Sequence, residues 1–231
     1  MLTDLKNNID FFIRNKTKFS RKNFAEKNEK KLLRNYHENL YTFDILDKFL
    51  SVADSSNTVE VLDIGCKNFF YAQGEYQFFK TQVQNVFLDG VEIDAYRLYS
   101  NFYSRYETAK FYIKNNKNIK YIANNLLNIE KKYDYIIWFL PFIKIEPHQY
   151  WGLPNKYFMP EKLLSHAYSL LQPNGQMLII NQGMEEAKIQ RHLLKKLKIK
   201  YTEKGIVKSS FLEYKNDRYA FLITKQPEFI K

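Results

Sequence analysis

From residue 59 onward, short apolar segments alternate with segments of helical periodicity, and this alternation limits the fold more than any other feature of the sequence. The apolar segments place Val, Ile, Leu and aromatic residues at consecutive positions, as in strands that are buried on both faces. The pattern predicts strands at 59–64, 86–93, 119–123, 133–140 and 176–180, and helices ending at 80 and spanning about 95–107, 161–171 and 184–197. A parallel sheet covered by helices on both sides fits this order.

Both ends of the chain depart from the alternation. Residues 206–214 and 218–225 flank a turn of Lys, Asn and Asp, which predicts a closing β-hairpin and an antiparallel edge to the sheet. Residues 29–54 carry apolar side chains at helical spacing, which predicts a helical segment. The predicted organisation is a helical N-terminal cap, 1–57, followed by an α/β domain, 58–231.

Cysteine content and the start of the chain exclude several classes of protein. Cys66 is the single cysteine among 231 residues, so there is no internal disulfide and no cysteine-based zinc cluster, and we predict no metal site. Charged residues interrupt the first segment at Asp4, Lys6, Asp10 and Arg14, which argues against a signal peptide or a membrane span. We therefore expect a cytoplasmic protein.

The formal net charge of +11 favours a phosphate-bearing partner such as nucleic acid. However, lysine is enriched together with Asn, Ile, Tyr and Phe, which is typical of a codon bias that selects no binding surface. The ten basic and four acidic residues among the first 35 are also what a solvated helix face contains. A small molecule is therefore the first expected partner, and RNA is the alternative. The sequence does not indicate the oligomeric state.

The predicted carboxyl ends of the strands carry the candidate binding residues, because open parallel sheets bind ligands at those ends. The first strand ends in Asp63-Ile64-Gly65, the entry to a tight turn before a helix. The second strand ends at Glu92, 27 positions after Gly65 (92 − 65), where a carboxylate can accept both hydroxyls of a ribose. A turn followed by an acid in this order indicates a nucleotide-type cofactor site.

Five segments in order resemble motifs of the class I S-adenosylmethionine-dependent methyltransferases: VLDIGC (61–66), GVEID (90–94), YIANNLLNI (121–129), YDYIIWFLPF (133–142) and LLQPNGQMLII (170–180). The resemblance covers residues 59–225. It implies a Rossmann-like, mostly parallel seven-stranded sheet with a C-terminal antiparallel hairpin, and S-adenosylmethionine as the cofactor. The cofactor-binding residues that it implies are Asp63, Gly65, Cys66, Lys67, Asn68, Glu92, Ile93, Asn124, Asn125 and Phe139.

The chain departs from the family pattern in the loop after the first strand. Lys67 and Phe69 replace two glycines, which in the family allow close backbone approach and tight helix packing. Asn68 tolerates a left-handed conformation, and Lys67 could pair with the carboxylate of the cofactor. Two functions stay open: an active methyltransferase, or a non-catalytic binding module that kept the fold and binds RNA through its basic surface.

The segment after the fourth predicted strand is expected to form the acceptor pocket. Family members that methylate exocyclic amines of bases have an amide where this chain has Phe139, so adenine-N6 methylation is disfavoured. Four Pro and Gly residues in 143–160 predict a loop without a regular helix, and its aromatic residues are placed to wall a pocket.

The acceptor is expected to be a small aromatic or apolar molecule, or RNA. His148 is the best available general base in the loop, although methyl transfer depends mainly on positioning. The predicted catalytic residues are Pro141, Phe142 and His148, and the predicted substrate-binding residues are Tyr150, Trp151 and, from the cap, Tyr36, with Phe43 as a second residue that could close the pocket.

Overall fold

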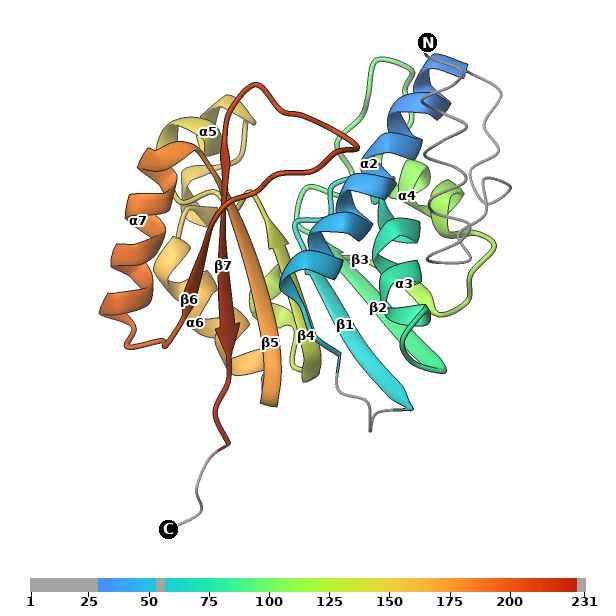
Figure 1. The fold of residues 1–231 in the computed structure, drawn as a ribbon. Helices are drawn as coiled ribbons and strands as arrows, with labels where there is room; N and C mark the ends of the chain where they lie inside the picture. The colour runs from blue at the N-terminus through green and yellow to red at the C-terminus, as the bar shows by residue number, and fades with distance from the viewer. Residues whose placement is uncertain (1–28, 53–56, 228–231) are drawn as a thin grey trace.

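A seven-stranded sheet with the order β3-β2-β1-β4-β5-β7-β6 forms the centre of the structure, a computed structural model that describes residues 29–52 and 57–227 (Figure 1). The strands β1 to β5 pair in parallel, and β7 pairs antiparallel with both β5 and β6. This confirms the predicted α/β class with a C-terminal antiparallel edge. The strands are β1 (Thr58–Ile64), β2 (Asn85–Glu92), β3 (Ile119–Ala123), β4 (Tyr133–Phe139), β5 (Leu171–Gln182), β6 (Thr202–Ile206) and β7 (Arg218–Thr224).

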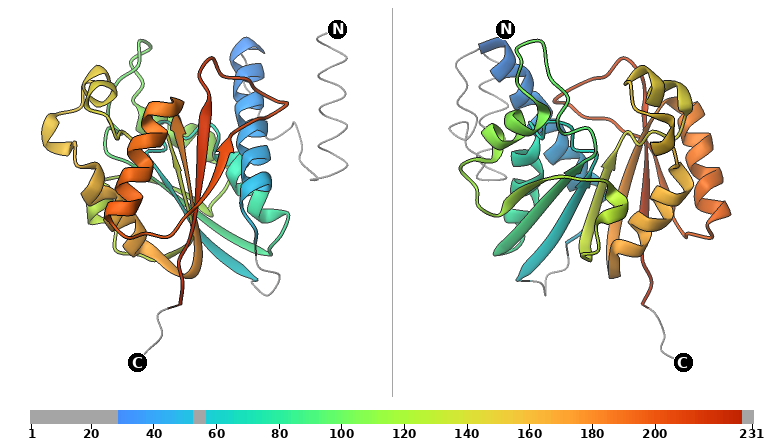
Figure 2. Two further views of the ribbon diagram at one scale, coloured as in Figure 1. Left: turned by 60° about the vertical axis from the view of Figure 1, so that its left-hand side comes forward. Right: turned by 180° about the vertical axis from the view of Figure 1, so that it is seen from behind.

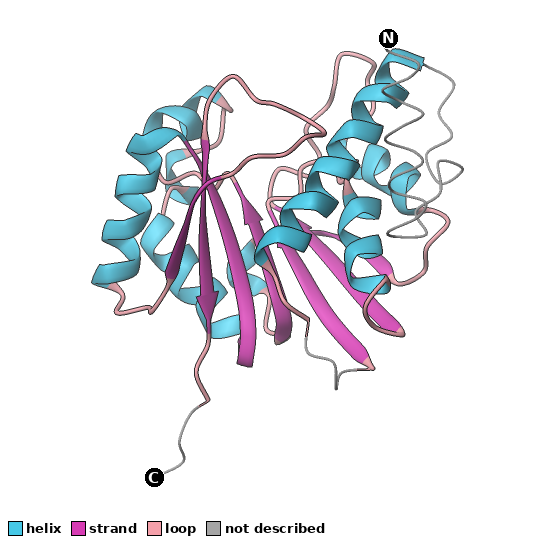
Figure 3. Cartoon of the chain, viewed as in Figure 1, coloured by secondary structure: helices cyan, strands magenta, loops and turns pink. Residues whose placement is uncertain are grey.

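Helices cover both faces of the sheet (Figure 3). One apolar cluster joins the sheet to α2, α3 and α4, and a second joins it to α6 and α7. Val61 of β1 belongs to the first cluster and its neighbour Leu62 to the second, which explains the continuous apolar runs of the sequence. The helices are α2 (Glu29–Phe49), α3 (Ala72–Lys80), α4 (Arg105–Ile113), α5 (Ile145–Tyr150), α6 (Pro160–Leu170) and α7 (Gly183–Lys196), with short 3₁₀ turns η2 (Leu126–Asn128) and η3 (Asn155–Tyr157).

Within the described residues, none of the helices combines the length and the hydropathy that a membrane span requires. The described part of the predicted cap is α2, and its buried residues Tyr41, Ile45 and Leu46 share one apolar cluster with β1 and α3. Residues 1–28 of the predicted cap lie outside the described residues. The division of the chain at 57–58 stays a prediction.

The helix predicted at 95–107 is wrong in both its start and its end, because α4 spans Arg105–Ile113. Ser104 caps it: its Oγ accepts from the Glu107 amide at 3.1 Å, and Glu107 Oε2 accepts from the Ser104 amide at 2.7 Å. Residues 94–103 form a loop instead, and Tyr96 and Phe102 are exposed on it. The reciprocal Ser and Glu spacing is readable in the sequence and could have located this start.

The strand predicted at 206–214 is also wrong. β6 lies earlier, and residues 207–217 leave the sheet and reach α2, where Lys48 Nζ donates to the Lys208 carbonyl at 2.8 Å and His37 Nδ1 donates to the Phe211 carbonyl at 2.8 Å. The views in Figures 1 and 2 show this 207–217 segment lying against α2. The hydrogen bonds to α2 replace the ladder that a longer hairpin would have formed.

Close packing between α2 and α3 depends on a glycine. A Cβ at Gly74 would lie 2.3 Å from the carbonyl oxygen of Asn39, so only glycine fits at the crossing. The fully buried Asn39 joins the two helices, because its Oδ1 accepts from the Gly74 amide at 2.7 Å and its Nδ2 donates to the Phe70 carbonyl at 2.9 Å. This contact fixes α2 over the start of α3.

We expect Gly74→Ala to lower the free energy of unfolding by about 1–3 kcal/mol, because the added methyl group forces the backbones of α2 and α3 apart. Urea unfolding followed by circular dichroism measures the change. Gln73→Ala, one position earlier on the same helix, is the control and should change stability by about 0.5 kcal/mol or less. An unchanged midpoint for Gly74→Ala would show that α2 does not pack at this distance.

Candidate functional site

A cavity of about 870 Å³ lies at the carboxyl ends of β1, β2 and β4. The strand order reverses between β1 and β4, which is the point where open α/β sheets bind ligands. Most of the predicted site residues line this cavity: Gly65, Lys67, Glu92, Ile93, Asn124, Asn125, Phe139, Pro141, Phe142, His148, Tyr150 and Trp151.

Four predicted site residues lie outside the lining of the cavity. Asp63 and Cys66 are fully buried behind the loop that follows β1, and Asn68 is half-buried beside them. Tyr36 is buried on α2 away from the cavity. Phe43 is half-buried and also lies outside the lining, with its ring packed on Phe78 at 5.9 Å. The wall that α2 contributes is instead formed by Glu38, Tyr41 and Thr42.

The loop after β1 has a positive φ at three positions, and only one of them, Gly65, is a glycine. Gly65 has φ of 73°, and Lys67 and Phe69, at the positions of the missing glycines, have φ of 55° and 52°. A left-handed residue with a side chain costs roughly 1–2 kcal/mol. Hydrogen bonds from the Lys67 amide to Glu92 Oε2 at 2.9 Å and from Tyr121 to the Lys67 carbonyl at 2.5 Å offset this cost.

The Phe69 side chain points away from the cavity and into the core. Its ring is fully buried and lies against β2 at Gly90, where a Cβ would come within 2.6 Å of the ring. The absence of a side chain at Gly90 therefore creates the space that Phe69 fills. The replacement of the family glycine by phenylalanine leaves the cavity open.

Glu92 is the last residue of β2, and its carboxylate makes several interactions. Oε2 accepts from the Lys67 amide, Oε1 accepts from the Asp94 amide at 2.8 Å, and the Arg105 guanidinium lies 3.7 Å from Oε1. Burial raises the pKa of Glu92, whereas the Asp94 amide and Arg105 partly oppose the shift. A carboxylate has about four acceptor positions, so these bonds leave room for the hydroxyls of a ribose.

Arg105 and Trp151 form a contact that the sequence did not indicate. Arg105 is buried, lies 3.2 Å from Asp94 Oδ2 and has its guanidinium 5.4 Å from the Trp151 ring centroid. Lys67 Nζ lies 4.8 Å from the same centroid, and Arg97 donates to the Trp151 carbonyl. These cation–π contacts tie the segment after β4 to the ends of β1 and β2. Trp151 is thus placed beside the predicted cofactor-binding residues.

The comparisons with known proteins agree with this geometry. Neither the known protein-family models nor the curated protein sequences give a match. Solved structures do match: a methyltransferase from Pyrococcus furiosus is 20% identical, with 82% of this chain and 83% of that chain covered and a TM-score of 0.53. The plantazolicin methyltransferase, solved with S-adenosylhomocysteine, is 16% identical, with 84% and 85% covered and a TM-score of 0.51. The magnesium protoporphyrin IX methyltransferase of Synechocystis, solved with bound S-adenosylmethionine, is 12% identical, with 96% and 97% covered and a TM-score of 0.51.

The chain has the class I methyltransferase fold. The strand order and these similarities confirm the predicted resemblance at the level of the fold. In this methyltransferase fold the cavity lies beside the loop after β1 and the acid at the end of β2, as the motif order predicted.

The segment after β4 contains a short helix, so the predicted absence of regular helix in 143–160 is wrong. Pro147 is the third residue of α5, where its missing amide hydrogen is not needed by the helix. His148 is buried between the rings of Phe142 and Phe158, at centroid distances of 5.8 and 5.4 Å, and its Nε2 donates to the Pro154 carbonyl at 3.0 Å. Only Nδ1 of His148 is left to accept a proton, and its role as general base stays a prediction.

Two carboxyl groups lie buried behind the cavity. Asp63 and Glu75 are fully buried, and Asp63 Oδ2 accepts from the Tyr71 hydroxyl at 2.8 Å. Among the described residues, Asp63 Oδ1 and both oxygens of Glu75 have no hydrogen-bond partner. Burial raises the pKa of both groups well above the usual range. Repulsion from Asp63 raises the pKa of Glu75 further, and repulsion from Glu92 raises that of Asp63. The Tyr71 hydroxyl partly opposes the shift at Asp63. Tyr71 also lines the cavity, so this buried pair borders its wall.

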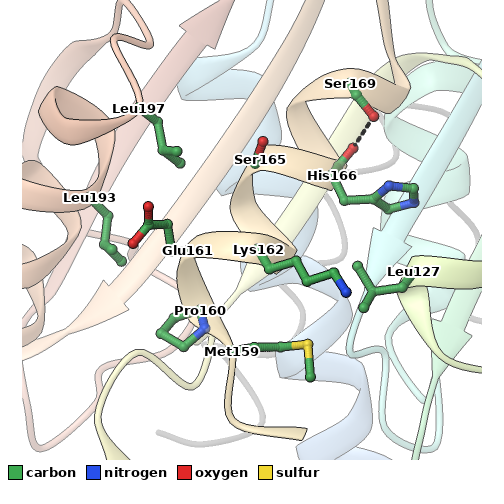
Figure 4. Close-up of a pocket in the computed structure, with 10 residues that line it drawn as sticks. All are labelled: Leu127, Met159, Pro160, Glu161, Lys162, Ser165, His166, Ser169, Leu193 and Leu197. Carbon is green, nitrogen blue, oxygen red and sulfur yellow. Dashed lines mark hydrogen bonds between the residues drawn. The ribbon is translucent and has the colours of Figure 1, made fainter.

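A second hollow, of about 890 Å³, lies between η2, α6 and α7 (Figure 4). Three of its polar side chains have partners within the protein: His166 Nε2 donates to the Ile129 carbonyl at 3.0 Å, Ser169 donates to the His166 carbonyl at 2.7 Å, and Glu161 pairs with Lys196 at 2.6 Å. No predicted site residue lines it. The candidate site is the cavity at the strand ends.

We expect Phe69→Gly, which restores the family residue, to destabilise the protein. Loss of the buried ring costs roughly 3–5 kcal/mol, and relief of the left-handed backbone returns about 1 kcal/mol. Urea unfolding should therefore show a net loss of at least about 2 kcal/mol. Phe102→Ala, at a residue that also has a positive φ but is 85% exposed, is the control and should change little. A stabilised Phe69→Gly variant would show that the ring is not part of the core.

We expect the buried carboxyl pair to make the protein less stable as the pH rises. Because their folded-state pKa values are raised, the folded chain binds more protons than the unfolded chain above the ordinary carboxyl pKa of about 4. Stability is then lost with rising pH, by at most about 1.4 kcal/mol per pH unit for each group. Glu75→Gln should match the wild type near pH 5 and be more stable at pH 8.

Urea midpoints at intervals from pH 5 to pH 8 measure this difference. Glu185→Gln, which alters an exposed carboxylate, should run parallel to the wild type. Parallel curves for Glu75→Gln and the wild type would contradict a raised pKa of Glu75 in the folded protein.

Proposed function

We propose that the chain is an S-adenosylmethionine-dependent methyltransferase that acts on a small aromatic or apolar acceptor. The observation that carries the proposal is the position of the cavity: it lies at the reversal of strand order and is lined by Gly65, Glu92 and Asn125 along one wall. Similar folds solved with S-adenosylmethionine or S-adenosylhomocysteine support the choice of cofactor.

The residues present fit this cofactor. Gly65, with a positive φ and nothing within 4 Å of an added Cβ, leaves space for close approach of a ligand to the backbone. Glu92 retains acceptor positions for the ribose hydroxyls. Asn125 uses its Oδ1 to accept from the Leu127 amide at 3.0 Å, which leaves its Nδ2 to donate to a ring nitrogen of the adenine.

The opposite part of the cavity suits an acceptor with apolar surface. Phe139, Phe142 and Tyr157 line it, and the Tyr71 ring lies 6.4 Å from Phe139. When bound, the cofactor supplies an activated methyl group on a sulfonium. The work of the protein is to hold the acceptor atom in line with that group and to exclude water. Walls of aromatic side chains restrict the position of the acceptor and exclude water.

RNA is the alternative acceptor. Seven of the ten basic residues that raised this alternative lie in residues 1–28, outside the described part of the chain. The cavity also carries acidic residues, with Glu38, Glu146 and Glu186 along its walls. A phosphate backbone would be repelled by these carboxylates.

We expect isothermal titration to show micromolar binding of S-adenosylhomocysteine and of S-adenosylmethionine. Glu92→Gln should weaken this binding at least tenfold, about 1.4 kcal/mol, because an amide is a poorer acceptor for the ribose hydroxyls. Glu60→Gln makes the same charge change on β1, in an ion pair with Lys131 and outside the cavity lining, and should bind as the wild type does.

Failure of a folded wild-type chain to bind either compound would reject the methyltransferase. That result would leave the non-catalytic module with the same fold as the better account. Equal losses in Glu92→Gln and Glu60→Gln would remove Glu92 from the site while leaving the cofactor assignment intact.

A further inference from the structure

Two segments outside the regular α/β alternation form one wall of the cavity. α2 contributes Glu38 and Tyr41, the 207–217 segment contributes Tyr214, and Arg218 follows at the start of β7. Arg218 pairs in the sheet with Gln182 at the end of β5. In the strand order β5 is separated from β1 by β4, so this wall lies on the far side of the cavity from the ends of β2 and β3.

The guanidinium of Arg218 lies between two tyrosines. Its Cζ is 3.2 Å from the ring centroid of Tyr214 and 5.3 Å from that of Tyr41, and Nη1 donates to the Tyr41 hydroxyl at 3.4 Å. The Tyr214 hydroxyl donates to Glu38, which holds that ring in place. The stacking restricts the plane of the guanidinium. Nη1 is used by Tyr41, whereas Nε and Nη2 donate to no other described residue.

Two other cations in the cavity wall, Arg105 and Lys144, have carboxylate partners, whereas Arg218 has none in the described part of the chain. Arg105 pairs with Asp94 at 3.2 Å, and Lys144 pairs with Glu185 at 2.5 Å. Among the described residues, no carboxylate lies within ion-pair distance of Arg218, and Glu38 is turned to Tyr214 instead. A half-buried guanidinium that lines a cavity and forms no direct ion pair with the described residues is suited to bind the carboxylate of a ligand.

The surroundings limit the kind of anion. One planar guanidinium matches one carboxylate in two parallel hydrogen bonds. A phosphate dianion carries twice the charge of a carboxylate, so Glu38 and Glu186 in the same cavity would repel it about twice as strongly. The rings of Tyr41, Tyr214 and Phe139 offer edge and face contacts to an aromatic ring beside the carboxylate.

We propose that Arg218 binds the carboxylate of a small aromatic carboxylic acid, and that this is the class of acceptor. The assignment of that acid as the methyl acceptor rests on the proposed methyltransferase function, whereas its binding at Arg218 does not. Arg218 is an acceptor-binding residue here and takes no part in the transfer step.

The test compares two probes of the same shape and different charge, 4-hydroxybenzoate and 4-hydroxybenzamide. We expect the wild-type chain, with S-adenosylhomocysteine present and in its absence, to bind the benzoate at least tenfold more tightly than the benzamide. Arg218→Met should remove this preference, and Arg218→Lys should retain part of it. Arg191→Met, which removes an arginine paired with Glu203 outside the cavity, should keep the full preference.

The outcomes separate the two proposals. Titration with S-adenosylhomocysteine should give the same affinity in Arg218→Met and in the wild type, so loss of cofactor binding alone rejects the methyltransferase and not the anion site. The comparison of probes on the wild type needs no variant, so a folding defect in Arg218→Met leaves the test intact. Equal binding of the two probes, no binding of either, or a preference that survives in Arg218→Met overturns the anion site.

Discussion

The packing of the Phe69 ring against Gly90 is the contact on which the shape of the site depends. Because Gly90 has no side chain, the ring occupies the core between β2 and the loop after β1. The loop must then take left-handed conformations at Lys67 and Phe69, which the bonds to Glu92 and Tyr121 stabilise. The ring fills the space beneath a turn in which Lys67 and Phe69, as well as Gly65, have positive φ.

The charged groups at the ends of β1 and β2 are organised around this loop. Glu92 receives the Lys67 amide, Arg105 approaches Glu92 and Asp94, and Trp151 lies over Lys67 and Arg105. One network therefore connects three segments that are distant in the sequence. Its consequence is that the aromatic segment after β4 is held beside the strand ends, where a wall of the cavity is needed.

The opposite wall depends on a different set of contacts. Asn39 fixes α2 to the start of α3, and the 207–217 segment leaves the sheet to bind the exposed side of α2. Together they place Tyr41, Tyr214 and Arg218 across the cavity from the loop after β1. α2 and the 207–217 segment, which lie outside the regular alternation of strands and helices, thus form the side of the cavity that we assign to the acceptor.

The sequence by itself determined the sheet, because short runs of consecutive apolar residues such as Val61 and Leu62, alternating with helical segments, are typical of strands covered on both faces. It also located Gly65, Glu92 and Asn125, since the carboxyl ends of parallel strands meet at one edge. Only the tertiary structure decided which way Phe69 points, that Tyr36 lies outside the cavity, and that Arg105 and Arg218 lie in its wall. Local periodicity specifies which residues form an element. It contains no information about contacts between residues far apart in the chain, and these positions are set by such contacts: Phe69 with Gly90, Arg105 with Trp151, and Arg218 with Tyr41.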